Sequence, residues 1–248
     1  MIKVLLSGYN GHMGEEVRLL TKNGYRDIII SAGVDINARG DEEVFCASDF
    51  ASAHTDVDCI IDFSHHLSTK PLLEFAKKEK LPVVLATTGQ TEEELEAIKE
   101  AAKEIPVFFS ANMSFGVALL VELAKKTAAS MPDADIEIIE THHIRKIDAP
   151  SGTAKMLFDE IKSVRPSAFA VNGRVGHAKR EKDEIGIHSL RMGNVAGIHE
   201  VIVATPNQTI TLKHEVHSRA LFAEGALVAA EFLSGKGAGL YCMKDLLT

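Results

Sequence analysis

The segment from Glu140 to Ala154 holds the residues of this chain that are best suited to chemistry. It reads Glu-Thr-His-His-Ile-Arg-Lys-Ile-Asp-Ala-Pro-Ser-Gly-Thr-Ala, so His142 and His143 are adjacent and Lys146 follows them three residues later. Imidazole and amine groups commonly transfer protons in catalysis. When both are protonated they repel each other, which lowers the pKa of each and eases proton delivery near neutral pH. The spacing therefore predicts acid–base chemistry.

An anion-binding turn is expected directly after these groups. Pro150 fixes the approach of the chain, and Ser151, Gly152 and Thr153 offer hydroxyl and backbone N–H groups where a helix is expected to begin. Such a helix start favours carboxylate oxygens. In a regular strand the two histidines point to opposite faces, so one can face the reacting centre and the other a substrate carboxylate. These features indicate an enzyme that acts on a small carboxylate, with a purely structural role for both histidines as the alternative.

The sequence gives little support to a metal centre or to a serine hydrolase. His65 and His66 form a second histidine pair, but adjacent histidines seldom bind one metal ion, and no H-x-E or H-E-x-x-H spacing accompanies them. No G-x-S-x-G sequence surrounds a serine. Cys46, Cys59 and Cys242 are odd in number and widely spaced, as expected of reduced thiols in a cytoplasmic protein. We therefore expect no bound metal.

A glycine-rich turn near the beginning of the chain predicts a dinucleotide site. The run Gly8-Tyr9-Asn10-Gly11-His12-Met13-Gly14 lies between an apolar strand and an amphipathic helix. Gly8 permits a tight turn, Gly11 lets the backbone approach a pyrophosphate, and Gly14 allows close packing of helix on strand. The N–H groups at the helix start then face the phosphates. We expect residues 8 to 13 to contact the cofactor.

The next strand ends at an acidic residue, which bears on the choice of cofactor. Asp35 lies 21 positions after Gly14, where an acid typically hydrogen-bonds the ribose hydroxyls. Its charge would repel the 2′-phosphate of NADPH and so favours NADH. Arg39, four residues further on, can offset this by pairing with that phosphate. Use of both cofactors stays open with NADH preferred, and a simple turn role for Asp35 is the alternative.

Three more loops are expected to reach the same cofactor. Each follows an apolar strand, and ligands bind at the carboxyl ends of strands in doubly wound sheets. The predicted contacts are Phe63 after one strand, Ala86, Thr87 and Thr88 after the next, and Ser110, Ala111, Asn112 and Met113 after a third.

The pattern of apolar residues predicts two architectures in sequence. Up to about residue 112, short apolar strands alternate with amphipathic helices, which is typical of a doubly wound parallel sheet covered by helices on both faces. The expected strands are 3–7, 27–34, 59–63, 83–86 and 107–110, and the expected helices are 13–22, 69–79 and 91–104. After about residue 130 the strands alternate polar and apolar residues, at 135–141, 184–191, 195–205 and 208–217. They predict a second, largely antiparallel sheet, followed by an apolar helix over 220–233. The charged run 177–184 is expected to be a solvated loop, or else a lid over the site.

Length and charge limit the remaining possibilities. At 248 residues the chain can form one or two domains. The formal charge of -8 argues against nucleic acid or an anionic membrane as the main partner. The apolar start of the chain is interrupted at Ser7, and no run approaches the ~18 apolar residues that a membrane span needs. We expect a cytoplasmic protein with a small-molecule ligand.

These motifs together resemble one enzyme family, the 4-hydroxy-tetrahydrodipicolinate reductases, also called dihydrodipicolinate reductases. The family signature E-x-H-H-x-x-K-x-D-A-P-S-G-T-A matches without a break from Glu140 to Ala154. Shorter matches extend over nearly the whole chain, at 62–64, 86–89, 110–113, 184–191, 218–219 and 239–241. The long signature is specific, whereas the glycine motif by itself is not.

The resemblance implies roles for individual residues. His142 matches the family's proton donor and acceptor, and Lys146 its proton donor. His143, Gly152 and Thr153 match substrate-binding positions, and Arg219 is placed with them or at the domain interface. Residues 8–13, Asp35, 86–88 and 110–113 match the nicotinamide cofactor positions.

The family also implies a fold and a reaction. Residues 1–112 and 219–248 are expected to form a Rossmann-like dinucleotide-binding domain. An inserted α+β domain over 113–218 is expected to bind the substrate and to assemble a homotetramer through its open mixed or antiparallel sheet. The implied reaction is the NADH- or NADPH-dependent reduction of a cyclic dicarboxylate. The alternatives are another Rossmann dehydrogenase, or a non-catalytic protein of the same fold that binds a nicotinamide dinucleotide.

Overall fold

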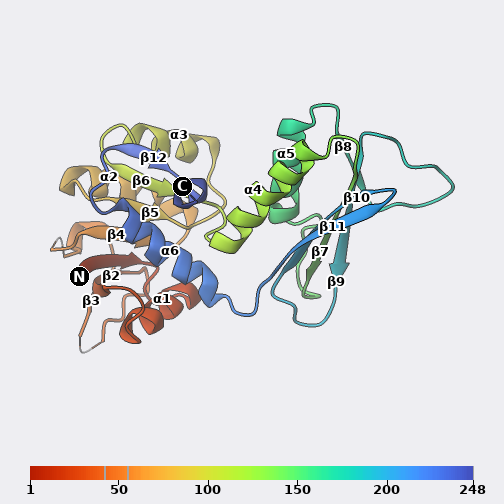
Figure 1. Cartoon of the computed structure of the whole chain (residues 1–248). Helices are drawn as coiled ribbons and strands as arrows, with labels where there is room; N and C mark the ends of the chain where they lie inside the picture. Colours follow the sequence, from red (N-terminus) through yellow and green to blue (C-terminus); the bar gives the residue numbers. More distant parts are fainter. Residues whose placement is uncertain (42, 55, 248) are drawn as a thin grey trace. The chain divides into compact units, whose positions relative to one another are not determined.

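The computed structural model describes residues 1–41, 43–54 and 56–247. The chain forms two compact units (Figure 1). Unit 1 comprises Met1–Phe115 with Ala220–Thr248, and unit 2 comprises Gly116–Arg219. The domain boundaries expected from the sequence fall at 112/113 and 218/219.

Unit 1 is built on a seven-stranded parallel sheet with the order β12-β6-β5-β4-β1-β2-β3. The part running from β3 through β1 to β6 has the strand order of a Rossmann fold, so the predicted doubly wound sheet is confirmed. The strands are β1 (Ile2–Ser7), β2 (Ile28–Val34), β3 (Phe45–Ala47), β4 (Cys59–Asp62), β5 (Val83–Leu85), β6 (Pro106–Phe109) and β12 (Gly239–Tyr241). Chain order reverses between β1 and β4, and at such a switch point the carboxyl ends of the strands form a crevice.

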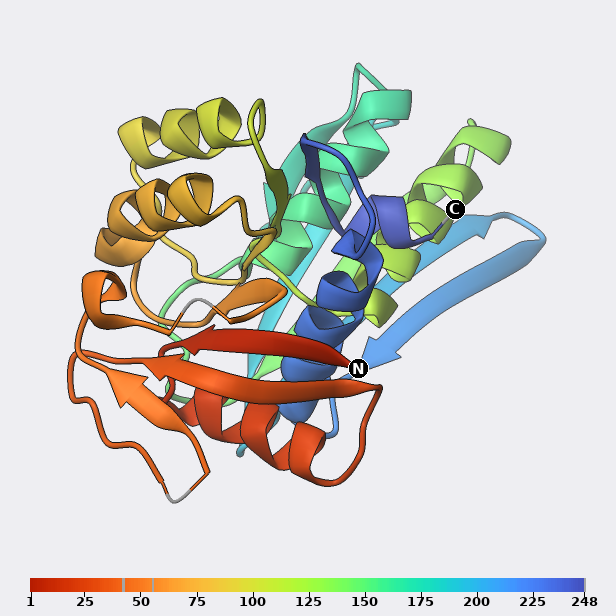
Figure 2. The same ribbon diagram turned by 90° about the vertical axis from the view of Figure 1, so that its left-hand side faces the viewer.

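Helices cover both faces of this sheet, as Figure 2 shows. On one face α1 (His12–Lys22) packs against α6 (Ala220–Leu233), and on the other α2 (Thr69–Glu79) packs against α3 (Glu92–Ala101). A capping box begins α3, where the Thr91 hydroxyl accepts from the Glu94 N–H and the Glu94 carboxylate accepts from the Thr91 N–H. Short 3₁₀ turns complete the unit at η1 (Phe50–Ser52), η2 (His66–Ser68) and η3 (Met243–Leu246). Because α6 is apolar on nearly all sides, it can be buried against both α1 and the sheet.

Unit 2 is a five-stranded sheet with the order β11-β10-β7-β9-β8 (Figure 1). The strands are β7 (Asp135–His142), β8 (Phe169–Asn172), β9 (Glu184–Arg191), β10 (Ile198–Thr205) and β11 (Gln208–Glu215). One face packs on α4 (Phe115–Ser130) and α5 (Gly152–Val164) through an apolar core that includes Ile136, Ile138 and Val201. Alternate residues of the strands face the other way.

The second sheet is mixed rather than largely antiparallel. β10 pairs antiparallel with β7 and β11, but β9 pairs parallel with β7 and β8. The resemblance implied a mixed or antiparallel sheet, and the mixed form is confirmed; the alternation of residues alone gave a largely antiparallel one. The parallel pairing arises because the connection from β7 to β9 includes α5, and a helical crossover returns the chain in the same direction. Strand β8 was not expected at all, since it is short and mostly exposed.

The charged run over 177–184 lies between β8 and β9 and is held at its base. Arg180 pairs with Asp135 at 3.0 Å and donates to the carbonyl of Ile136 at 3.2 Å, while Arg174 pairs with Glu184. The glycines at 173 and 176 have positive φ, as a tight turn requires. No helix in the described ranges is long and apolar enough to cross a membrane.

Candidate active site

A buried histidine–carboxylate pair closes the end of β7. His142 and Glu140 are two residues apart on this strand, so their side chains point to the same face. The His142 Nδ1 lies 2.5 Å from Glu140 Oε2, and Glu140 is fully buried. Arg191 stands opposite His142 in the parallel register of β9 and donates to both oxygens of Glu140 at 2.9 Å. The Ser151 N–H adds a further donor to Glu140 Oε1 at 3.2 Å.

These contacts decide the protonation of the pair. Burial opposes ionisation of Glu140, but hydrogen bonds from Arg191, Ser189 and His142 outweigh it and lower the pKa of Glu140 to about 2. Burial also lowers the pKa of His142, and the nearby charge of Glu140 offsets this only in part. Since an ionised carboxylate can only accept, neutral His142 carries its proton on Nδ1. Its Nε2 makes no hydrogen bond within the described residues and is left for chemistry.

Lys146 lies on the turn that leaves β7 and is close to both histidines. Its charge contributes to lowering the pKa of His142 and of His143. The Lys146 Nζ pairs with Asp148 Oδ1 at 2.8 Å, and its backbone N–H donates to the His143 carbonyl at 3.1 Å. The structure therefore brings the two predicted catalytic side chains, His142 and Lys146, into one locality of unit 2.

The predicted anion-binding turn begins α5. Ser151 is the N-cap residue, and its hydroxyl accepts from the Ala154 N–H at 3.2 Å and lies 3.2 Å from His199 Nε2. Its side chain is buried and already engaged in the fold. Gly152 is different, because a Cβ there would meet no described atom within 4 Å. Open space therefore lies beside the first turn of the helix.

His143 has a buried ring nitrogen that could form a hydrogen bond with a ligand. Its Nδ1 is buried and has no hydrogen-bond partner among the described residues. Burial lowers the pKa of His143, and the charges of Arg145 and Arg219 lower it further. Arg219, predicted to bind substrate, thus lies within electrostatic range of His143 in the same unit. Arg145 was not predicted and donates to Asn194 Oδ1 at 2.6 Å.

Three residues of this site, Glu140, Arg191 and His199, were not predicted from the sequence to take part in it. Glu140 and Arg191 lie inside matched segments, and their place in the family signature was the available signal. His199 lies opposite Glu140 on β10, and its ring meets that of His142 edge to face at 5.1 Å. Burial lowers the pKa of His199 to about 4, so it is neutral near pH 7. No local pattern in the sequence pointed to His199.

In unit 1 the glycine-rich turn has the conformation that a dinucleotide requires. Gly8 has a φ of +79°, and a Cβ there would lie 2.7 Å from the Phe63 carbonyl oxygen. A Cβ on Gly14 would overlap the backbone of Gly8 and Tyr9, so only glycine permits this helix–strand contact. Gly11 is the N-cap residue of α1 and has no side chain to cap it. The first turn of α1 is therefore open to phosphate oxygens.

A cavity of about 910 Å³ adjoins this turn, which is large enough for much of a dinucleotide. Six predicted cofactor residues line it, namely Gly8, Asn10, Gly11, Asp35, Arg39 and Phe63. The Asp35 oxygens accept from the N–H groups of Asn10 and Asn37, each at 2.9 Å, which fixes the carboxylate beside the cavity. The residues present thus fit a nicotinamide dinucleotide.

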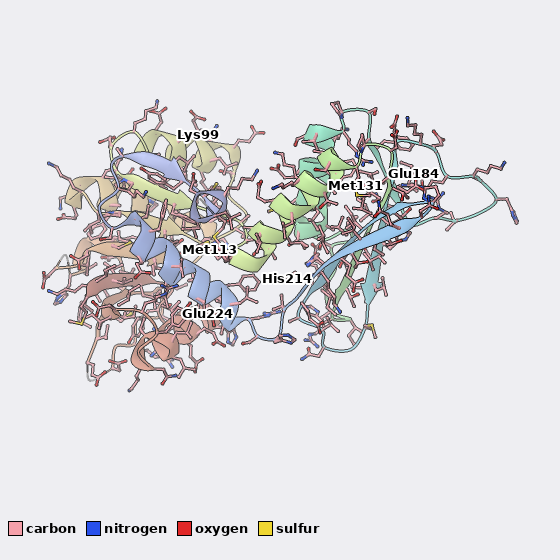
Figure 3. All side chains as sticks on the ribbon, in the orientation of Figure 1. Lys99, Met113, Met131, Glu184, His214 and Glu224 are labelled. Atoms are coloured by element: carbon pink, nitrogen blue, oxygen red, sulfur yellow. The ribbon has the colours of Figure 1, made fainter. Side chains whose placement is uncertain are left out.

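Other predicted cofactor side chains serve the fold instead. The Tyr9 side chain is buried and its hydroxyl donates to Asp41 at 2.7 Å. The Thr87 hydroxyl donates to the buried carboxylate of Asp62 at 2.5 Å. Met113, labelled in Figure 3, is 2% exposed, and its carbonyl lies against Gly225 of α6. The predicted residues outside the lining of the cavity are Tyr9, His12, Met13, Ala86, Thr87, Thr88, Ser110, Ala111, Asn112 and Met113. The loops after β5 and β6 nevertheless lie at the same carboxyl edge of the parallel sheet as the cavity.

The second histidine pair is not part of a metal cluster. His66 Nδ1 lies 3.1 Å from the Glu94 carboxylate, and His65 caps the 3₁₀ turn η2. Within residues 1–41, 43–54 and 56–247, no group of three or more histidine, cysteine or acidic residues is arranged to hold a metal ion.

A Rossmann sheet with this turn, together with a separate unit that carries a buried acid–base pair, defines a nicotinamide-dependent oxidoreductase. Comparison with known proteins makes the assignment more specific. Residues 2–113 match the family model of the dihydrodipicolinate reductase N-terminus, and residues 116–247 match that of its C-terminus. The chain therefore belongs to the dihydrodipicolinate reductase family, as its motifs suggested.

Individual relatives agree along the whole chain. The 4-hydroxy-tetrahydrodipicolinate reductase of Caldanaerobacter subterraneus subsp. tengcongensis is 46% identical, over 100% of this chain and 98% of the relative. That of Clostridium tetani is 43% identical, over 100% and 97%. The dipicolinate-bound dihydrodipicolinate reductase of Paenisporosarcina sp. TG-14 is similar in structure, with a TM-score of 0.83, 25% identity and 99% of both chains covered.

Proposed function

We propose that this protein is a 4-hydroxy-tetrahydrodipicolinate reductase of the diaminopimelate route to lysine. It would convert (2S,4S)-4-hydroxy-2,3,4,5-tetrahydrodipicolinate to (S)-2,3,4,5-tetrahydrodipicolinate, taking up one hydride and one proton and releasing one water. The observation that carries the proposal is the grouping at the end of β7, where His142, Lys146 and the open start of α5 meet. Family membership points to the same reaction.

His142 and Lys146 are the proton-transferring groups of this proposal. Because Glu140 holds the Nδ1 proton of His142, exchange with the substrate takes place at Nε2. Lys146 supplies a proton from Nζ after it leaves Asp148, which binds it in the structure at 2.8 Å. Water loss and reduction both need proton movement, and the imidazole of His142 and the amine of Lys146 can serve these two needs.

The dicarboxylate substrate requires a positive, hydrogen-bonding surface. Gly152 and Thr153 at the start of α5 would donate to one carboxylate, since the helix dipole and the free space at Gly152 favour an anion there. His143 would bind through its unpaired Nδ1, supported by the charge of Arg219. Ser151 would assist through the fold of the turn, because its hydroxyl is already hydrogen-bonded.

The cofactor would be held by unit 1. The backbone of residues 8–13 would bind the pyrophosphate, and the loops at 86–88 and 110–113 would approach the nicotinamide. When bound, the reduced nicotinamide supplies the hydride from C4. Asp35 would accept hydrogen bonds from the ribose hydroxyls, so NADH would be preferred, while Arg39 on the same cavity would allow some use of NADPH.

Cofactor preference can be tested through these two side chains. Asp35→Asn removes the charge that repels a 2′-phosphate, so the ratio of kcat/KM for NADPH to that for NADH should rise. Arg39→Ala should lower the same ratio. An unchanged ratio in both variants would show that neither side chain faces the ribose.

The family resemblance also leads us to propose a homotetramer that assembles through the open face of the second sheet. Ile139, Leu190 and Ile202 alternate with core residues and so lie on the face away from α4 and α5. Analytical ultracentrifugation should then give four times the chain mass of 26.9 kDa. A monomer or dimer would reject this part of the proposal.

The reaction itself is tested by following reduced-nicotinamide absorbance when the protein meets substrate made in situ by the preceding synthase. Oxidation that depends on both the protein and the synthase would support the proposal. Cofactor binding without oxidation would favour the alternative of a non-catalytic dinucleotide-binding protein.

A further inference from the structure

Arg191 links the two proton-transferring parts of the site. Its guanidinium donates to both oxygens of Glu140 at 2.9 Å and also to the Asp148 carbonyl at 2.6 Å. Glu140 holds His142, and the Asp148 side chain holds Lys146. One planar side chain on β9 thus fixes the carboxylate behind the histidine and the turn that carries the lysine.

The hydrogen bonds to Glu140 leave its carboxylate a single orientation. Oε1 accepts from Arg191 and from the Ser151 N–H, while Oε2 accepts from Arg191 and His142. The residue is fully buried, so water cannot replace any of these donors. Ser189 on β9 adds a further hydrogen bond to it. A carboxylate held in this way keeps Oε2 in place as the acceptor for His142 Nδ1.

The opposite edge of the imidazole is left clear by a glycine. A Cβ on Gly197 would lie 3.2 Å from His142 Nε2, closer than side chains normally approach. The charged and titratable groups around the ring are Glu140 on its own strand, the adjacent His143, Lys146 on the turn, Arg191 on β9 and neutral His199 on β10. His142 thus has one nitrogen bound to a fixed acceptor and one nitrogen with space before it.

We infer that Glu140 and Arg191 are positioning residues of the proposed reduction, and the inference rests on that proposed function. Glu140 keeps the proton of neutral His142 on Nδ1 and its lone pair on Nε2. Arg191 keeps Glu140 in place and holds the Asp148 backbone, so that the Lys146 turn stays beside the histidine. Neither residue needs to touch the substrate.

Replacing Glu140 by glutamine should reverse the tautomer. Arg191 donates to both oxygen positions, so either orientation of the amide sets its NH₂ against one guanidinium N–H. At the Oε1 position the NH₂ would also oppose the Ser151 N–H, so we expect it at the Oε2 position, facing His142 Nδ1. Nδ1 would then become the acceptor, and the proton would move to Nε2. Glu140→Asp keeps a carboxylate acceptor and should preserve the native tautomer.

The matched control is Glu137→Gln, the same change on the same strand. Glu137 also binds a histidine, His188, at 2.9 Å, but its side chain points to the opposite face of the sheet. It tests whether any histidine–glutamate pair in this sheet affects turnover.

The experiment combines ¹⁵N NMR of histidine-labelled protein with steady-state kinetics. We expect His142 to be the Nδ1–H tautomer in the wild type and in Glu140→Asp, and the Nε2–H tautomer in Glu140→Gln. Turnover of Glu140→Gln should fall roughly 10²–10³-fold with little change in KM, because a carboxylate that orients a catalytic histidine acts mainly on kcat. Glu137 lies on the face proposed for assembly, so ultracentrifugation should first show that Glu137→Gln has the same mass as the wild type, and its turnover should then equal that of the wild type.

Arg191→Lys and Arg191→Ala test the other member of the pair. Arg191→Lys retains the charge but not the two-pronged contact, so kcat should fall while the protein stays folded. Added guanidinium should restore part of the activity of Arg191→Ala, which a purely structural defect would not allow. The inference is overturned if Glu140→Gln keeps both the native tautomer and wild-type kcat, or if Glu137→Gln loses as much activity. Should the wild type itself not oxidise cofactor, the proposed function fails, and the tautomer measurement still decides whether Glu140 positions His142.

Discussion

Two histidine–glutamate pairs of the second sheet both have their glutamate on β7, but they differ in burial and in the groups around them. His142 and Glu140 lie on the helix-covered face of the second sheet, with side chains 10% and 0% exposed. His188 and Glu137 lie on the open face, with side chains 34% and 30% exposed. Glu140 receives two bonds from Arg191 at 2.9 Å, whereas the nearest arginine nitrogen to Glu137, on Arg180, is 3.6 Å away.

The difference shows which conditions allow a histidine–glutamate pair to fix the tautomer of its histidine. In the single chain an exposed pair can exchange its partners with water, so the sheet by itself fixes neither the tautomer of the histidine nor the rotamer of the carboxylate. A buried pair cannot, provided that every remaining acceptor is satisfied. Arg174 and Arg180 lie near both Glu137 and Glu184. In Figure 3, Glu184 lies at the opposite end of the second sheet from His214. His214 lies opposite His199 and so marks the end that carries His142.

The largest effect that we expect from the site outside the buried pair is at Lys146. Lys146→Ala removes the second proton-transferring group, and kcat should fall by ~10²–10⁴-fold, the range typical of a lost general acid. Lys213→Ala is the control, since Lys213 pairs with Glu200 and Glu215 in the same unit but far from the turn in sequence. Equal losses in the two variants would show that the effect is one of general stability.

The second prediction concerns stability in acid and separates the two glutamates. The pKa of Glu140 is lowered from its ordinary value of 4.5 to about 2 in the folded protein, since the donors around it outweigh its burial. A lowered folded-state pKa contributes stability that is complete above pH ~4.5 and is lost as pH falls towards ~2. The contribution is of the order of 3 kcal/mol. Urea unfolding measured from neutral pH down to the acid limit of folding should show this loss in the wild type and in Glu137→Gln. A similar slope in Glu140→Gln would contradict it.

The third prediction tests the anion site at the start of α5. A methyl group at Gly152 would meet no described protein atom, but it would occupy the space proposed for a substrate carboxylate. Gly152→Ala should raise KM about tenfold, equivalent to ~1.4 kcal/mol of binding. Thermal stability should be unchanged or slightly higher, as for alanine replacing a helical glycine. Gly237→Ala, at another glycine with open space, is the control and should leave KM unchanged.

The smallest effect is expected at Gly197. Gly197→Ala should push the His142 ring away from its rotamer, at a cost of roughly 0.5–1.5 kcal/mol. This predicts a fall in kcat of about two- to tenfold, since 1.4 kcal/mol corresponds to a factor of ten. Steady-state kinetics would measure it, and the His142 tautomer should not change. A larger fall than that of Lys146→Ala would mean that Gly197 has a further role.

Much of the fold could be predicted because its signals are local. The strands and helices of the Rossmann unit, the capping box at Thr91 and the glycine turn each occupy a few adjacent residues. The missed elements are short or ambiguous. Strands β3 and β12 have three residues each, and α4 is apolar on most sides, so its periodicity does not distinguish helix from strand. The parallel pairing of β7 with β9 depends on a crossover and has no local signature.

The types of residue in the candidate site could be predicted from the sequence, but the contacts that hold these residues in place could not. His142, Lys146 and Gly152 could be selected because acid–base groups and a helix start lie together in the sequence. The contact between Glu140 and Arg191 joins positions 51 residues apart, which only the sheet brings together. The side chains of Tyr9, Thr87 and Met113 are used within the fold, because a loop near a cofactor must also be packed against its own domain.

The most direct test of this account compares His142→Asn with His188→Asn in the synthase-coupled oxidation of reduced nicotinamide. Both variants lose a histidine bound to a glutamate of β7. With both variants shown to assemble as the wild type does, we predict that kcat falls by ~10²–10⁴-fold for His142→Asn and stays within about twofold of the wild type for His188→Asn. Comparable activity in the two variants would contradict it, because the buried pair would then have no special part in the reaction.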